Sequence, residues 1–257
     1  MMRRGLACQG TKWAFRLAVA SVLFLIPMIA VQLAVAVPAG AAQSTPSQTL
    51  PTSARRPNIV FILTDDLSLN LVQYMPHVLK MQKEGVTFAN SFVTDSLCCP
   101  SRSSIFTGRY PHDTGVFMNQ GKDGGYLVFR NRGHEQATFA TALSAVGYRT
   151  AMLGKYLNGY LPALHPAAPG WTSWAVAGNG YPGFAYNLRQ DGQIVHHGRK
   201  SADYLTDVLS DLAVRFIKEK PDQPFFIEVA TFAPHAPYTP APRDADAFPG
   251  LRAPRQR

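Results

Sequence analysis

The chain has 257 residues, of which 46% are hydrophobic and 16% charged, a composition that suits one large or two small globular domains. Its net charge of +9 comes from the two ends: residues 1–56 and 252–257 hold nine basic and no acidic side chains, which leaves 16 of each sign between them. This balance argues against a general affinity for nucleic acid. Only three cysteines are present, which excludes a fold built on a disulfide network.

Residues 1–42 are typical of an export signal. Four basic residues precede an apolar run over residues 17–37, and small residues follow at positions 39–42. This order predicts a cleaved signal peptide, with a retained membrane anchor as the alternative because the apolar run is long. We therefore expect a secreted or extracytoplasmic protein that contacts a membrane only through this segment. Residues 43–56 are rich in Ser, Thr, Pro and Gln, which predicts a disordered linker.

From residue 57 onward, predicted strands and helices alternate. Apolar runs predict three strands buried on both faces, over residues 58–63, 148–153 and 224–229. Apolar residues at helical spacing predict helices over residues 75–85, 137–145 and 204–218, and Asp191-Gly192 predicts a hairpin over residues 184–197. This alternation indicates an α/β fold, a largely parallel sheet flanked by helices.

Polar residues follow each predicted strand, where open α/β sheets hold their ligands. Asp65 and Asp66 follow the first strand, Lys155 the second and His235 the third. Adjacent carboxylates repel each other and suit a hard divalent cation such as Ca²⁺. Taken alone, such a pair is more often a helix cap or a solvated turn, and a single Lys or His at these places is commonly solvated or structural.

Residues 98–109 read CCPSRSSIFTGR, with Pro100 two positions and Arg102 four positions after Cys98. Adjacent cysteines alone would be interpreted as small buried side chains. The segment resembles the signature of the type I sulfatases, in which a formylglycine-generating enzyme oxidises the first cysteine to Cα-formylglycine. Cys99 lacks Pro and Arg at the corresponding positions, so the register favours Cys98 as the modified residue.

The resemblance implies an alkaline-phosphatase-like fold and a sulfuric ester hydrolase. In this family the two acids, here Asp65 and Asp66, bind a divalent cation, usually Ca²⁺, together with the modified residue, here Cys98. The equivalent of Arg102 holds the formylglycine oxygens. The hydrated aldehyde attacks the sulfur of a sulfate ester substrate.

Two further matches concern the sulfate itself. Lys155 matches the family lysine that contacts the sulfate, and His235 matches the histidine that contacts it and can act as an acid. The run Lys155-Tyr156-Leu157-Asn158 is similar to the glucosamine-6-sulfatase branch, which suggests a sulfated glycan as substrate.

The resemblance runs from about residue 56 to 251, so residues 57–257 are expected to be the N-terminal part of a sulfatase catalytic domain. The family's second metal-binding segment and its later sulfate-contacting lysine are not found, which indicates a truncated sulfatase, weakly active or inactive alone. Two alternatives stay open. One is a phosphonate or phosphate monoester hydrolase of the same superfamily, and the other is a non-catalytic remnant that binds sulfated glycans.

Overall fold

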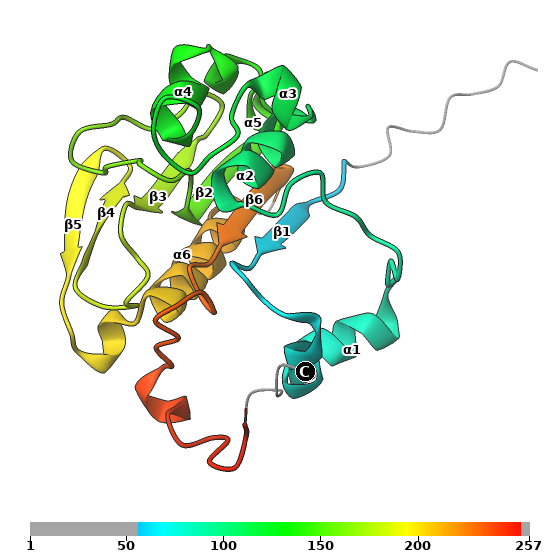
Figure 1. Cartoon of the computed structure of the whole chain (residues 1–257), viewed down its shortest axis with the longest axis vertical. Coiled ribbons are helices and arrows are strands. Elements are labelled where there is room, and N and C mark those ends of the chain that lie inside the picture. The colour runs from blue at the N-terminus through cyan, green and yellow to red at the C-terminus, as the bar shows by residue number, and fades with distance from the viewer. Residues whose placement is uncertain (1–55, 221, 253–257) are drawn as a thin grey trace, which may run out of the picture. The chain divides into compact units, whose positions relative to one another are not determined.

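The computed structural model describes residues 56–220 and 222–252, so the predicted leader and nearly all of the predicted linker lie outside the described residues. Its centre is a six-stranded sheet with the strand order β1-β6-β2-β3-β4-β5 (Figure 1). Strands β1, β6, β2 and β3 run parallel, and β4 and β5 continue the sheet antiparallel, which confirms the predicted α/β fold. The strands are β1 (Ile59–Leu63), β2 (Arg149–Lys155), β3 (Ser173–Ala177), β4 (Tyr186–Gln190), β5 (Gln193–His197) and β6 (Phe225–Ala230).

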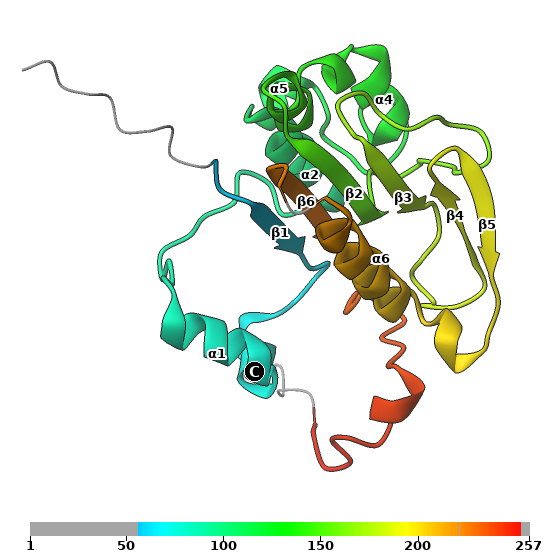
Figure 2. The same ribbon diagram turned by 180° about the vertical axis from the view of Figure 1, so that it is seen from behind.

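Helices cover both faces of the sheet (Figures 1 and 2). Side chains alternate between the faces of a strand, so Met152 of β2 packs into an aromatic core beneath α2, α4 and α5, whereas Leu153 packs against α6 on the other side. The α-helices are α1 (Pro76–Glu84), α2 (Cys98–Thr107), α3 (Pro111–Thr114), α4 (Gly125–Asn131), α5 (Phe139–Ala145) and α6 (Leu205–Glu219). None of the helices in the described part is long and apolar enough to cross a membrane.

Strand β1 differs from its prediction as a strand buried on both faces. It is the last strand on its side of the sheet, and one of its faces is open, with Val60 52% and Ile62 57% exposed. The cause is the position of α6, which packs mainly against β2 and β6 and leaves β1 at the side (Figure 2). The apolar run therefore predicted the strand correctly and its burial wrongly.

The region between β1 and α2 is poorly buried in the same way. Helix α1 confirms the predicted helix over residues 75–85, yet it has no buried side chain. The segment that follows exposes three large apolar side chains, Val86, Phe88 and Phe92, each by at least 80%. This part of the chain thus presents apolar surface that the described residues do not cover.

Other predicted elements are confirmed with small shifts in their bounds. The turn at Asp191-Gly192 joins β4 and β5, and Thr138 caps α5 through a reciprocal pair of hydrogen bonds with Thr141. Strand β3 was missed, because five residues with Trp174 at the centre give only a weak periodic signal. Gly154 in β2 has φ +100°, and a Cβ there would lie 2.0 Å from the Ala230 carbonyl oxygen, so only glycine lets β2 and β6 approach before Lys155.

Candidate active site

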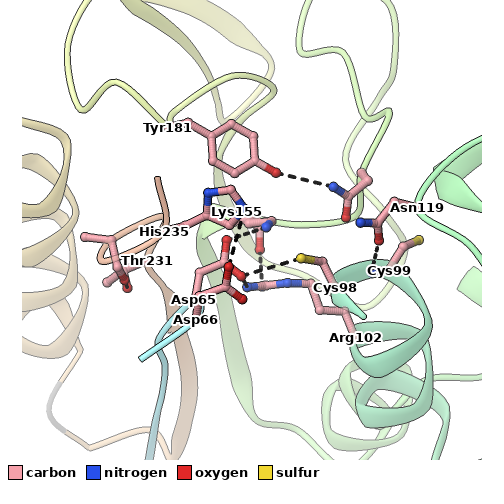
Figure 3. A network of polar contacts seen from close by, with 12 residues as sticks. Asp65, Asp66, Cys98, Cys99, Arg102, Asn119, Lys155, Tyr181, Thr231 and His235 are labelled. Atoms are coloured by element: carbon pink, nitrogen blue, oxygen red, sulfur yellow. Dashed lines mark hydrogen bonds and ion pairs between the residues drawn. The ribbon is translucent and has the colours of Figure 1, made fainter. Parts of the chain in front are cut away.

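The carboxyl ends of β1, β2 and β6 meet the N-terminus of α2 at one edge of the sheet (Figure 3). Backbone hydrogen bonds hold this junction: the Thr231 amide donates to the Leu63 carbonyl (2.9 Å), and the Asp65 amide donates to the Ala233 carbonyl (3.3 Å). The structure brings all six sequence-predicted site residues together here: Asp65, Asp66, Cys98, Arg102, Lys155 and His235.

Asp65 is the centre of the charge network. Its side chain is 5% exposed and forms a buried ion pair with the Lys155 ammonium group. On its other oxygen, Oδ1, it faces the Arg102 guanidinium at 3.6 Å, and Arg102 also donates to the Lys155 backbone carbonyl (2.9 Å). Two buried cations thus converge on one buried carboxylate, which gives the site an excess of positive charge suited to an anion.

Cys98 is the first residue of α2 and is only partly buried. Its Sγ lies 3.8 Å from Asp65 Oδ1, so the side chain points into the charged cluster. The N-terminus of a ten-residue helix adds a partial positive charge at the same point. A cavity of ≈ 90 Å³ opens in front of Cys98, lined also by both aspartates and Arg102.

Cys99 has a different environment. It is fully buried in the aromatic core, and its backbone amide donates to Asn119 Oδ1 (2.7 Å). Burial raises the pKa of the Cys99 thiol to about 11. Of the two adjacent cysteines, only Cys98 faces the charged cluster.

His235 closes the cluster from the segment after β6. Its Nδ1 donates to the Ala236 carbonyl (2.8 Å), and its Nε2 lies 3.5 Å from Asp66 Oδ2. Asp66 itself has φ 59°, an uncommon left-handed conformation that Asp tolerates better than most residues. With Nδ1 as the donor, a neutral ring turns a lone pair toward the Asp66 carboxylate, so a proton or a cation between the two groups stabilises this arrangement.

A metal ion could be held at the same place. Ligand atoms of Asp65, Cys98 and His235 lie within 4.8 Å of one another, and the Asp66 carboxylate faces His235. Carboxylate oxygens fit a hard divalent cation, but they provide fewer than the roughly six to eight oxygen ligands that Ca²⁺ takes. The side chains in the described residues therefore supply part of the coordination shell of a divalent cation.

Sequence reasoning missed Glu228, which lies in the middle of β6. It is 0% exposed, and neither carboxylate oxygen has a hydrogen-bond partner among the described residues. Because Ile227 points to the α6 side, Glu228 points to the α2 side, where Arg102 partly offsets its charge. Burial still raises the pKa of Glu228 to about 8. A charged residue in the run FFIEVA was the available signal.

Tyr181, in the loop after β3, was also missed. Its ring centroid lies 4.9 Å from Lys155 Nζ and 4.6 Å from the His235 ring, and its hydroxyl accepts a hydrogen bond from Asn158 Nδ2 (3.3 Å). The ring thus covers the lysine on the side away from Arg102 (Figure 3). A lone Tyr in a Gly-rich loop carries no sequence pattern that predicts such a position.

These features together define an α/β protein of the alkaline-phosphatase-like class, with a positively charged site around Cys98 at the carboxyl edge of its parallel strands. The chain belongs to the sulfatase family, whose model matches residues 57–256. One curated relative, the human N-acetylglucosamine-6-sulfatase, is 39% identical over 215 residues, which are 79% of this chain and 39% of the relative. The extracellular sulfatase SULF-1 homolog of Drosophila melanogaster is 35% identical over 202 residues, 76% of this chain and 18% of the relative.

A solved structure described as a complex with its substrate D-glucosamine-2-N,6-O-disulfate has a TM-score of 0.64 and 27% sequence identity to this chain. The match covers 78% of this chain and 39% of the solved one. The chain thus spans about two fifths of the length of these proteins, or less.

Proposed function

We propose that this chain carries the nucleophile and sulfate-binding part of a sulfatase centre that acts on the sulfate ester of a sulfated sugar. The observation that carries the proposal is the position of Cys98. It starts α2, faces buried Asp65 and borders the ≈ 90 Å³ cavity beside Arg102. The relatives named as glucosamine-6-sulfatases support a sulfated sugar as the substrate class.

Lys155 and Arg102 bind the negative charge. Both side chains are less than 5% exposed, so their attraction for a sulfate is screened by little water. The ion pair with Asp65 and the ring of Tyr181 hold Lys155 in one orientation, which fixes where sulfate oxygens are held. Arg102, anchored on the Lys155 carbonyl, orients the side chain at position 98.

His235 is the residue that we assign as the acid. Its Nδ1 is occupied by the Ala236 carbonyl, so a protonated ring presents its second proton at Nε2, beside Asp66. From Nε2 that proton can pass to the sugar oxygen as the ester bond breaks. Asp66 stabilises the protonated ring and keeps it oriented.

The centre would need a bound divalent cation and a formylglycine at position 98. Asp65, Asp66 and the side chain at position 98 would bind a divalent cation, which we propose is Ca²⁺. When bound, the cation supplies positive charge for sulfate oxygens, and formylglycine at position 98 supplies an oxygen nucleophile in place of a thiol. A formylglycine-generating enzyme is then a required partner. We also propose export through the N-terminal segment, in line with the extracellular relative.

The experiment is co-expression of the chain with a formylglycine-generating enzyme, followed by mass spectrometry of the peptide that contains Cys98. N-acetylglucosamine 6-sulfate and the matching 6-phosphate are then compared as substrates, with Cys98→Ala as the blank. We expect modification at Cys98 and slow, Ca²⁺-dependent release of sulfate in preference to phosphate. Preferred phosphate release supports the phosphatase alternative. An unmodified Cys98 in a chain that binds the glycan without hydrolysis supports the non-catalytic one.

A further inference from the structure

Helix α2, which begins with Cys98, receives no cap from the residue before it. Leu97 occupies the N-cap position with an extended backbone, and its side chain has no oxygen to accept from the free amides of the first turn. Pro100 has no amide hydrogen, and the amide of Cys99 donates to Asn119 Oδ1 (2.7 Å), twenty positions further along the chain. The first turn of α2 is therefore capped by a side chain from outside the helix.

Asn119 belongs to a closed loop between α3 and α4. The Gly125 amide donates to the Met118 carbonyl (3.0 Å), which joins the two sides of this loop. A Cβ at Gly124 would lie 1.9 Å from the Met118 carbonyl oxygen, so glycine is required for the two sides to approach. Backbone contacts thus hold Asn119 in place, independently of its own hydrogen bond to α2.

The same loop is connected to the segment after β2, which begins with Lys155. The Tyr126 amide, at the start of α4, donates to the Asn158 carbonyl (2.7 Å), three residues after that lysine. The side chain of Cys99 faces the backbone of both Gly125 and Asn158. Cys99 is therefore the place where α2, the loop and the segment after β2 meet.

This junction fixes the direction of Cys98. Consecutive residues of a helix point about 100° apart, so the orientation of Cys99 sets that of Cys98. Cys99 is fully buried in the aromatic core, whereas Cys98 Sγ lies 3.8 Å from Asp65 Oδ1. Figure 3 shows the Asn119 side chain directed at α2 from the side of Cys99. If the first turn loosened, Cys98 would leave the cluster, while the lysine paired with Asp65 would keep its place.

We propose that Asn119 is a positioning residue of the centre: by accepting from the Cys99 amide, it holds the first turn of α2 so that the side chain at position 98 points at the sulfate site. The inference rests on the proposed function, because it takes position 98 as that of the nucleophile. The role requires a side-chain oxygen at position 119. Aspartate offers such an oxygen at the same reach, and leucine, which is branched in a similar way, does not.

The test uses the full, unmodified chain, in which residue 98 keeps its thiol. Asn119→Leu removes the acceptor, Asn119→Asp retains it, and Asn131→Leu, exposed at the end of α4, is the matched control. Hydrogen–deuterium exchange followed by mass spectrometry is measured on the peptide of residues 97–101. Iodoacetamide labelling of Cys98 is then timed with and without inorganic sulfate, which is added at about ten times the dissociation constant that calorimetry gives for each variant.

We expect exchange in this peptide to be about fivefold faster in Asn119→Leu than in the wild type, as for a lost helix cap, with the exchange of β2 and β6 unchanged. Sulfate should slow the labelling of Cys98 by about tenfold in the wild type and by less than about threefold in Asn119→Leu. Asn119→Asp should restore both values, and Asn131→Leu should change neither.

Unchanged exchange in Asn119→Leu, or equal acceleration in β2 and β6, would overturn a role at the start of α2. Faster exchange with full protection of Cys98 by sulfate would show that the hydrogen bond is only structural, and would also overturn the proposal. Failure of sulfate to bind the wild type would overturn the proposed function. The exchange rates and their rescue by Asn119→Asp would then still decide whether Asn119 holds the first turn of α2.

Discussion

Asp65 and Lys155 are 90 positions apart in the chain, yet their side chains form an ion pair from which water is nearly excluded. The pair joins the end of β1 to the end of β2 across β6, which lies between them in the sheet. It also means that a divalent cation at Asp65 competes with the lysine ammonium. A sulfate bound beside Lys155 would share the ammonium charge with Asp65 and weaken the hold of the lysine on that carboxylate, so we expect the cation and the sulfate to favour each other's binding.

The first prediction concerns this competition. Ca²⁺ should raise the thermal unfolding midpoint of the chain, with a gain of about 2.7 kcal/mol at a hundredfold excess over its dissociation constant. Asp65→Asn should abolish the Ca²⁺-dependent increment, measured by differential scanning calorimetry with and without a chelator. Asp123→Asn, an exposed acid outside the cluster, is the matched control and should keep it. If Ca²⁺ raised the unfolding midpoint of Asp65→Asn as much as that of the wild type, Asp65 would not be a metal ligand.

The two neighbouring cysteines should differ in reactivity. In unmodified protein at pH 8, iodoacetamide should label Cys98 and spare Cys99, because the thiolate is the reactive form and Cys99 is buried with its pKa raised to about 11. Peptide mapping by mass spectrometry locates the label. Cys98→Ala should lose native-state labelling of this peptide, and urea should restore it at Cys99. Rapid labelling of Cys99 in the folded state would contradict the assignment of the two environments.

Arg102 should be a large contributor to stability. Arg102→Ala leaves the buried Asp65 carboxylate without this cation, and loss of one partner from such a buried pair costs about 3–5 kcal/mol. Urea unfolding followed by circular dichroism measures the loss, with exposed Arg109→Ala as the control. At pH 9, above the Glu228 pKa of about 8, the buried Glu228 carboxylate also loses the Arg102 charge, so adding Glu228→Gln should recover about 0.5–3 kcal/mol there. Strict additivity of the two substitutions would show that the groups do not interact.

Glu228 should also set part of the pH dependence of stability. Its pKa is about 8 in the folded chain against an ordinary value of 4.5, so between these values the folded state keeps a proton that the unfolded state has lost. The contribution is therefore fully present below pH 4.5 and is lost as the pH rises through 8, by up to about 1.4 kcal/mol per pH unit. Urea unfolding from pH 5 to 9 should show this loss in the wild type and not in Glu228→Gln. The same dependence of stability on pH in the wild type and in Glu228→Gln would contradict this prediction.

The sequence predicted strand and helix positions well where the pattern is local. The helix predicted over residues 204–218 and the turn at Asp191-Gly192 depend on neighbouring residues, and both are confirmed. The burial of β1 was wrong, because it depends on where α6 packs, and α6 lies about 145 positions later in the chain. Local periodicity contains no information about such a partner.

The same difference between local patterns and distant contacts applies to the residues of the candidate site. Asp65, Cys98 and Lys155 were found because each stands in a short motif or just after a strand. Glu228 and Tyr181 were missed, because their closeness to Arg102 and Lys155 arises from the pairing of strands and the return of a loop. Contacts between side chains distant in the chain require the assembled sheet.

The position of β1 at the end of the sheet has a consequence for handling the protein. Its outer backbone N–H and C=O groups meet no neighbouring strand among the described residues, and its open face carries Val60 and Ile62. Such an edge is a template for strand addition by another chain. Self-association should therefore grow with protein concentration, and refolding yield should be highest in dilute solution.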